Sequence, residues 1–199
     1  MRAPALLRLM ATCLAFAGVA SAAELASAPS LAARAARFPP LRSATAAFDQ
    51  EREVSLVDEV LRAKGRLTLA APASFRLDLT EPEPMTLAAD DKTLVVRDAQ
   101  GKTLPVPAEF AGLATFARTL TDLLLGSRSP AGFAETWRDP DTVTLVPQAG
   151  TTGPFSEITL RFAPTGPLPG EIVMRERGGD RTTIRLHDVV LNAPAAKGP

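Results

Sequence analysis

Apolar and polar residues alternate with a period of two along many separate segments of this 199-residue chain. Between Leu61 and Leu69 every second residue is apolar or glycine, and the intervening positions include Arg62, Lys64 and Arg66. Because successive side chains of a strand point to opposite faces, this segment predicts a strand with one apolar and one charged face. The same alternation recurs at Phe75, Leu77 and Leu79; Met85 and Leu87; Leu94 and Val96; Val143 and Leu145; Ile158, Leu160 and Phe162; Ile172 and Met174; and Ile184 and Leu186.

Short turns separate these alternating segments. Pro72 lies in one connection, the run Glu-Pro-Glu-Pro at 81–84 forms another, and Asp-Asp-Lys at 90–92 forms a third. Half-buried strands joined by such turns predict an antiparallel sheet. At His187 and Asp188 the alternation changes phase, which predicts a β-bulge.

Two segments have a helical pattern instead. Between Pro107 and Leu125 the apolar residues follow the 3.6-residue period, and Gly126 supplies a stop signal. A shorter Ala-rich helix is expected over 23–37, with Ser30 as its N-cap and Pro39-Pro40 beyond its end. Helix 107–125 interrupts the strands, so we expect an α+β fold in which it lies across a curved antiparallel sheet.

The first 22 residues have the three parts of a secretory signal. Arg2 and Arg8 provide positive charge, residues 10–19 are apolar, and Ala-Ser-Ala at 20–22 is a cleavage site. A lipoprotein signal acylated at Cys13 is the alternative. We expect a signal peptide over 1–22, a single domain over 23–192, a flexible tail over 193–199, and export to the periplasm.

The composition leaves little room for catalysis or nucleic-acid binding. Lys plus Arg and Asp plus Glu number 22 each, so the chain lacks the basic excess that phosphate binding requires. The chain has one histidine and one cysteine. His187 beside Asp188 is more typical of a surface pair than of a general base, and the carboxylates at 81, 83, 90 and 91 lie in turns. We expect no enzymatic activity, no cofactor and no metal site.

The aligned apolar faces allow two interpretations. In one, the helix and the sheet form a solid core of an exported structural or scaffold protein. In the other, the concave face of the sheet is too large for one helix to fill and leaves an apolar cavity. Periodicity alone does not separate them.

A series of local motifs carries a family resemblance. Phe48-Asp49-Gln50 is followed by Gly65–Leu69, which runs on to Pro72 and to Phe75-Arg76. The remaining motifs are Pro82-Glu83-Pro84, Asp91-Lys92-Thr93-Leu94, Leu123–Gly126, Thr142–Pro147 and Ile184–Asn192. In this order the chain resembles the periplasmic outer-membrane lipoprotein carrier family, LolA, over about residues 31–192.

The resemblance implies an unclosed antiparallel β-barrel, that is, a strongly curved sheet lidded by α-helices as in LolA and LolB. It implies a monomeric periplasmic carrier that binds lipoprotein acyl chains and moves them from an inner-membrane transporter to an outer-membrane receptor. The expected acyl-binding residues, in cavity and lid, are Leu67, Leu69, Phe75, Leu77, Leu87, Leu94, Val96, Phe110, Leu113, Leu120, Leu124, Val143 and Leu145.

The chain departs from the closest family pattern at two places. Ala71 stands where a basic residue often precedes the proline, and the sequence ends soon after Asn192 where those members continue with another strand. The alternative is therefore a carrier or accessory protein of the same fold for another lipid, such as a glycolipid or a product of a fatty-acid or polyene pathway.

Overall fold

The computed structural model describes residues 29–57, 59–71, 74–90, 93–105, 121, 123, 125, 132–151 and 153–193. Within these residues one short helix, α1 (Leu31–Ala35), precedes a series of strands. The strands are β1 (Ser43–Val54), β2 (Glu59–Ala70), β3 (Ser74–Glu81), β4 (Met85–Ala89), β5 (Leu94–Asp98), β6 (Thr103–Leu104), β7 (Phe133–Asp139), β8 (Thr142–Pro147), β9 (Phe155–Phe162), β10 (Pro169–Glu176) and β11 (Arg181–Leu191).

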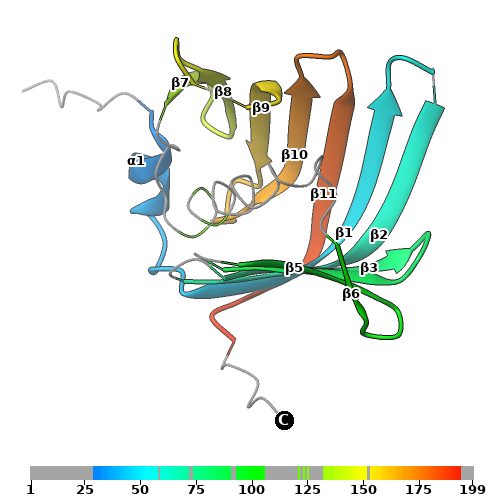
Figure 1. Cartoon of the computed structure of the whole chain (residues 1–199). Coiled ribbons are helices and arrows are strands. Elements are labelled where there is room, and N and C mark those ends of the chain that lie inside the picture. The colour runs from blue at the N-terminus through cyan, green and yellow to red at the C-terminus, as the bar shows by residue number, and fades with distance from the viewer. Residues whose placement is uncertain are drawn as a thin grey trace, which may run out of the picture.

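All of these strands belong to one antiparallel sheet. Their order is β6-β5-β4-β3-β2-β1-β11-β10-β9-β8-β7, so β6 and β7 form its two edges. Figure 1 shows that the sheet bends strongly and that α1 lies at one end of its concave side. The predicted open, curved antiparallel sheet is therefore confirmed. The predicted helix 107–125 lies outside the described residues except at positions 121, 123 and 125.

Helix α1 begins where its N-cap was predicted. The Ser30 side chain accepts a hydrogen bond from the backbone N–H of Ala33 at 3.0 Å. The helix ends at Ala35, and its buried residues are Leu31 and Arg34. Ala35 and Phe38 are only partly buried.

The first and last strands meet at the centre of the sheet. Strand β1 pairs with β2 on one side and with β11 on the other. The β1–β11 register shifts opposite Thr45–Ala47, where Asp188 has a φ of 52°. The phase change at His187 and Asp188 is therefore the predicted bulge.

Gly65 allows a close approach inside this sheet. It pairs with Phe48 across β1 and β2. A Cβ at position 65 would lie 2.1 Å from the backbone oxygen of Asp78 and 2.9 Å from the Phe48 ring. Glycine therefore lets the Phe48 ring, which is almost fully buried, pack directly over the backbone of β2.

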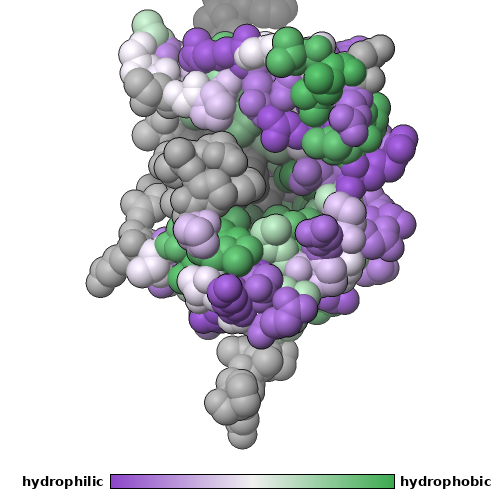
Figure 2. Space-filling view, turned by 45° about the vertical axis from the view of Figure 1, so that its right-hand side comes forward, coloured by the Kyte–Doolittle hydropathy of each residue, from purple (hydrophilic) through white to green (hydrophobic). Residues whose placement is uncertain are grey.

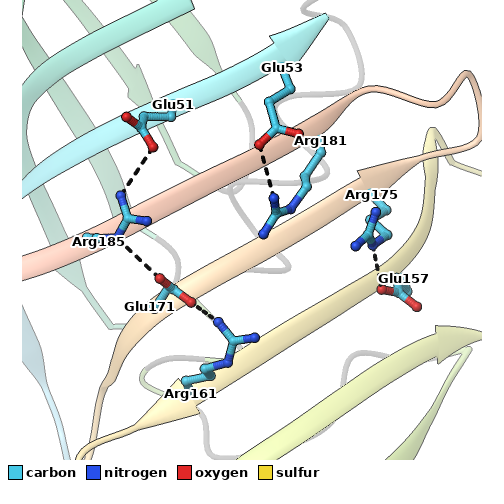
Figure 3. A network of polar contacts seen from close by, with 8 residues as sticks. All are labelled: Glu51, Glu53, Glu157, Arg161, Glu171, Arg175, Arg181 and Arg185. Atoms are coloured by element: carbon cyan, nitrogen blue, oxygen red, sulfur yellow. Dashed lines mark hydrogen bonds and ion pairs between the residues drawn. The ribbon is translucent and has the colours of Figure 1, made fainter. Parts of the chain in front are cut away.

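The opposite face of the central strands is charged. Glu51 of β1 contacts Arg185 of β11 at 3.3 Å, and Arg185 contacts Glu171 of β10 at 3.2 Å. Glu171 also pairs with Arg161 of β9, and Figure 3 shows the four side chains as one row across the strands. This row, called the ionic row below, lies on the solvent-exposed face, which is the charged face that the alternation predicts.

Candidate functional site

The concave side of the sheet carries a continuous apolar surface, called the concave apolar face below. Its buried side chains belong to one cluster that most of the strands supply. On β1, β2, β3, β4 and β5 the buried members are Ala44, Ala46, Phe48, Leu67, Leu69, Phe75, Leu87, Ala89 and Val96; on β8, β9, β10 and β11 they are Val143, Leu145, Ile158, Leu160, Ile172, Met174 and Leu186. The surface is almost entirely aliphatic, with Phe48 and Phe75 as its buried aromatic members.

Burial along this face falls from one end of the sheet to the other. On β2 the exposed fraction is 0% at Leu69, 4% at Leu67 and 47% at Leu61. On β3, Phe75 is buried, whereas Leu79 is only partly buried. The two ends of the sheet are named here for what lies there: the α1 end, where burial is complete, and the hairpin end, where the β1–β2 turn lies.

A buried arginine closes the α1 end. The Arg34 guanidinium donates to Asp141 Oδ1 at 2.7 Å and to three backbone carbonyl oxygens, those of Pro140, Ala163 and Gly166. It also lies 4.4 Å from the centre of the Phe162 ring. The Arg34 side chain is only 4% exposed, so these contacts hold α1 firmly against the β7–β8 and β9–β10 turns.

A second contact joins α1 to the edge strand β7. The backbone N–H of Leu31 donates to Glu135 Oε2 at 2.9 Å, and the same oxygen accepts from Trp137 Nε1 at 2.9 Å. A carboxylate thus occupies a concave-face position of β7, where the strand's alternation would otherwise place an apolar residue.

The structure places the predicted site residues as follows. Leu67, Leu69, Phe75, Leu87, Val96, Val143 and Leu145 are buried in the concave apolar face, and Leu77 and Leu94 are partly buried against it. Phe110, Leu113, Leu120 and Leu124 lie outside the described residues. The face also includes Phe48, Ile158, Leu160, Ile172 and Met174, which were absent from the predicted set. Their alternating spacing was visible in the sequence, but periodicity does not say which strands share one face.

Three residues near the end of the predicted helix are described, and all are buried. Thr121, Leu123 and Leu125 are 1%, 5% and 7% exposed, and Leu125 N–H donates to the Thr121 carbonyl at 2.8 Å. Leu123 and Leu125 belong to the same apolar cluster as the concave face.

The one histidine of the chain lies at the surface. His187 is exposed, and its ring nitrogens lie 3.1 Å from Asp49 Oδ2 and Asp188 Oδ2. This is the surface pair that the sequence predicts, with a second carboxylate added. Among the described residues, no three His, Cys, Asp or Glu side chains gather closely enough to hold a metal ion. The described helical residues include no stretch with the length and hydropathy of a membrane span.

Comparison with known proteins gives one family. The sequence pattern of the family described as "Outer membrane lipoprotein carrier protein LolA" matches residues 40–198. No curated protein matches the chain in sequence.

Several solved structures are similar to this chain. A DUF1329 family protein from Desulfovibrio piger has 10% identity and a TM-score of 0.48, covering 83% of this chain and 92% of that one. A LolA superfamily protein from Nitrosomonas europaea has 10% identity and a TM-score of 0.46, with 82% and 93% covered. A putative outer membrane lipoprotein-sorting protein domain from Vibrio parahaemolyticus has 8% identity and a TM-score of 0.45, with 83% and 92% covered.

Proposed function

This chain belongs to the LolA family of outer membrane lipoprotein carrier proteins, and from that membership we propose that its concave apolar face binds acyl chains. The cargo proposed first is a lipoprotein, taken from an inner-membrane transporter and delivered to an outer-membrane receptor. The signal-like segment 1–22 supports export, so the proposed location is the periplasm.

The concave apolar face is the observation that carries this proposal. Aliphatic side chains such as Leu67, Leu87 and Leu145 form one surface across the sheet, which suits a flexible hydrocarbon because it imposes no hydrogen-bond geometry. Each buried methylene contributes ~0.8 kcal/mol, so one long acyl chain offers roughly 10 kcal/mol of gross driving force. Neither a nucleophile nor a metal is needed for such binding.

Ala63 gives a direct test of where the acyl chain lies. It is partly buried on the concave side of β2, between exposed Leu61 and buried Leu67, so a larger side chain there narrows the face without entering the tightly packed α1 end. We expect Ala63→Phe to weaken acyl binding about tenfold or more and to change the melting temperature little. The measurement is displacement of an environment-sensitive apolar dye by a long-chain acyl ligand.

Lys64→Phe is the matched control. Position 64 is the next residue of β2 and points to the opposite, exposed face, so the same added bulk should leave acyl affinity unchanged. If the wild-type protein melts cooperatively but takes up no dye, the solid-core interpretation is correct and the proposed function is wrong.

We also propose that helix 107–125 is the lid of this face. The burial of Leu123 and Leu125 in the concave cluster supports this placement. Leu120→Glu would place a carboxylate against aliphatic surface, and burying that charge costs free energy. A lid can avoid this cost by moving away from the sheet, whereas a helix in a solid core cannot. We expect modest loss of stability with acyl binding much weakened. Global unfolding of Leu120→Glu would show that the helix is part of a solid core.

A different lipid cargo is the second candidate, and Ala71 favours it. The residue is exposed in the turn after β2, and its side chain is a methyl group where members of the closest family pattern often have a basic residue. Mass spectrometry of the lipids that co-purify with the protein from its native envelope distinguishes a lipoprotein cargo from another lipid. Acylated peptides would identify a lipoprotein carrier, and glycolipids or fatty-acid or polyene products the alternative.

A further inference from the structure

Four exposed aliphatic side chains gather at the end of the β1–β2 hairpin. Leu56 is 91% exposed, Val57 61%, Val60 45% and Leu61 47%, and together they are called the hairpin tip. Among the described residues, only Val146, Val189 and Val190 are other large apolar side chains with comparable exposure. Figure 2 shows hydrophobic residues gathered at the upper right, where this hairpin ends. Single exposed apolar residues are ordinary, but such a cluster marks an interaction surface.

The base of the hairpin tip is fixed by polar contacts. Ser55 donates from both its N–H and its hydroxyl to Asp180 Oδ1, at 3.0 and 3.1 Å. Arg52 contacts Asp180 at 3.0 Å and Glu176 at 3.1 Å. These bonds tie the β1–β2 turn to the neighbouring β10–β11 turn. Leu56 is therefore presented to solvent by an anchored turn.

The hairpin tip is continuous with the concave apolar face. Leu61 occupies the same side of β2 as Ala63, Leu67 and Leu69, because alternate residues of a strand share a face. Their burial increases stepwise away from the tip, from 47% exposed at Leu61 to 0% at Leu69. A hydrocarbon chain lying along β2 would thus run from Leu61 over Ala63 to Leu67, and the charged side chains on this side, Glu59 of β2 and Arg52 of β1, flank it only at the hairpin end.

The chemistry of the tip fits the hydrocarbon of a lipid layer better than a protein partner. Its side chains are Leu and Val, which favour the bilayer core, whereas protein-interface hot spots are enriched in Trp, Tyr and Arg. The cations near the tip have acidic partners: Arg62 contacts Glu51, and Arg52 contacts Asp180. The tip therefore offers apolar insertion, with no unpaired basic patch among its described neighbours to attract anionic lipid.

We propose that the hairpin tip inserts into the acyl layer of a membrane and sets the hairpin end of the concave apolar face against it. The insertion itself follows from the exposed cluster. The transfer of an acyl chain along β2 rests in addition on the proposed acyl-binding function. Docked in this way, the protein loads or releases an acyl chain without exposing it to water.

Vesicle flotation tests the insertion. The wild-type protein should bind phosphatidylcholine vesicles, and Leu56→Ser combined with Val57→Ser should weaken that binding at least about tenfold, since two aliphatic side chains no longer enter the lipid. The matched control is Val189→Ser with Val190→Ser, because these exposed valines lie far from the tip on β11 and should not matter. If the tip double variant bound vesicles as tightly as the wild type, the proposal would be overturned.

A tryptophan introduced at position 56 would report how deeply the hairpin tip enters the lipid. In Leu56→Trp, lipids brominated along their acyl chains should quench the new indole strongly, while Val190→Trp should be quenched no more than the native Trp137. Binding should persist at high salt, because it is apolar. Loss at high salt, or binding only to phosphatidylglycerol vesicles, would show electrostatic attraction instead and overturn the proposal. A tip-dependent dimer in sedimentation would assign the surface to a second copy and overturn it as well.

A final pair of measurements separates this inference from the proposed function. The tip double variant should bind a dissolved acyl ligand as tightly as the wild type but take it up from vesicles about tenfold more slowly. Tip-dependent vesicle binding by a wild-type protein that holds no acyl ligand would sustain the insertion and refute the acyl-binding function. Acyl binding with vesicle uptake unchanged in the tip variant would overturn the insertion and leave that function standing.

Discussion

At the scale of single residues, Arg34 joins parts of the chain that are far apart in sequence. Its side chain is buried and makes charge-assisted hydrogen bonds to Asp141 and to the Ala163 and Gly166 carbonyls. Hydrogen bonds that involve a charged group are stronger than neutral ones. If the guanidinium is removed, the oxygen atoms that accepted its hydrogen bonds lose their donor, which costs free energy of folding. Much of the attachment of α1 to the sheet therefore depends on this one residue.

Replacing this guanidinium should measurably destabilise the fold. We expect Arg34→Met to lower the free energy of unfolding by about 2–3 kcal/mol, because the Asp141 carboxylate and two turns lose their donor. For a chain of this size that corresponds to about 4–12 °C in melting temperature. Arg37→Met, an exposed arginine just beyond the same helix, is the control and should change the melting temperature little. Equal melting temperatures for the two variants would contradict this role.

Asp180 predicts part of the response to acid. The Ser55 backbone N–H, and then Arg52, hold the pKa of its carboxyl below its ordinary value. A carboxyl with a lowered folded pKa adds stability that is complete above its unfolded pKa and is lost as the pH falls through the folded one. Asp180→Asn should therefore lose less stability than the wild type between about pH 4 and pH 2. Chemical denaturation across that pH range measures the difference, and parallel curves would contradict it.

The sequence made some of these residues predictable and concealed others. Leu67, Phe75 and Leu145 follow the two-residue period, so their burial could be read from local spacing alone. Arg34 carries no such signal, because its partners lie 106 to 132 positions further along the chain. A charged residue on a short Ala-rich helix is ordinarily solvent-exposed, and only the folded sheet supplies the carbonyl groups that surround it.

At the scale of elements, the ionic row links four neighbouring strands. Arg185 of β11 lies between Glu51 of β1 and Glu171 of β10 (Figure 3). The pKa of the Glu51 carboxyl is lowered by its hydrogen bonds from Arg185 and then Arg62, so it stays charged at neutral pH. Exposed pairs of this kind contribute little singly, but opposite charges on facing strands favour one register over its neighbours.

Reversing the central charge of this row tests its electrostatics. Arg185→Glu should lower the free energy of unfolding by about 1–2 kcal/mol at low salt, because it places like charges on facing strands. The loss should shrink in 1 M salt, where the Debye length is about 3 Å. Arg185→Gln should cost less than about 1 kcal/mol. A loss from Arg185→Glu that does not depend on salt would mean that packing, not charge, is responsible.

Strand β7 shows why some elements escaped prediction. Its concave side presents Phe133, Glu135 and Trp137, so a carboxylate interrupts the apolar alternation. That carboxylate accepts hydrogen bonds from Leu31 N–H and from Trp137 Nε1. The bond from Leu31 forms only when α1 packs against β7, so no local sequence pattern indicates it. Strands β2, β3 and β9 have no such interruption, and their alternation was sufficient. The pairing of β1 with β11 was also beyond local patterns, since it joins residues more than a hundred positions apart.

At the scale of the whole molecule, ligand binding and stability should be linked. If the concave apolar face holds an acyl chain in the folded state alone, free ligand at about 100 times its dissociation constant adds about 2.7 kcal/mol to the free energy of unfolding. Ligands with fewer methylenes should bind more weakly by up to ~0.8 kcal/mol per methylene removed. Thermal melts over a series of chain lengths measure this gradient, and a melting temperature indifferent to chain length would contradict it.

The pairing of β1 with β11 at the centre of the sheet has a consequence for folding during synthesis. Strands β1 to β6 leave the ribosome first, yet one edge of β1 stays unpaired until residues 181–191 have been made. Contacts this distant in sequence form slowly, and an unpaired strand edge invites aggregation. Without β11, strands β1–β6 and strands β7–β10 have no hydrogen-bonded connection. We therefore expect a chain truncated before β11 to misfold and to be degraded.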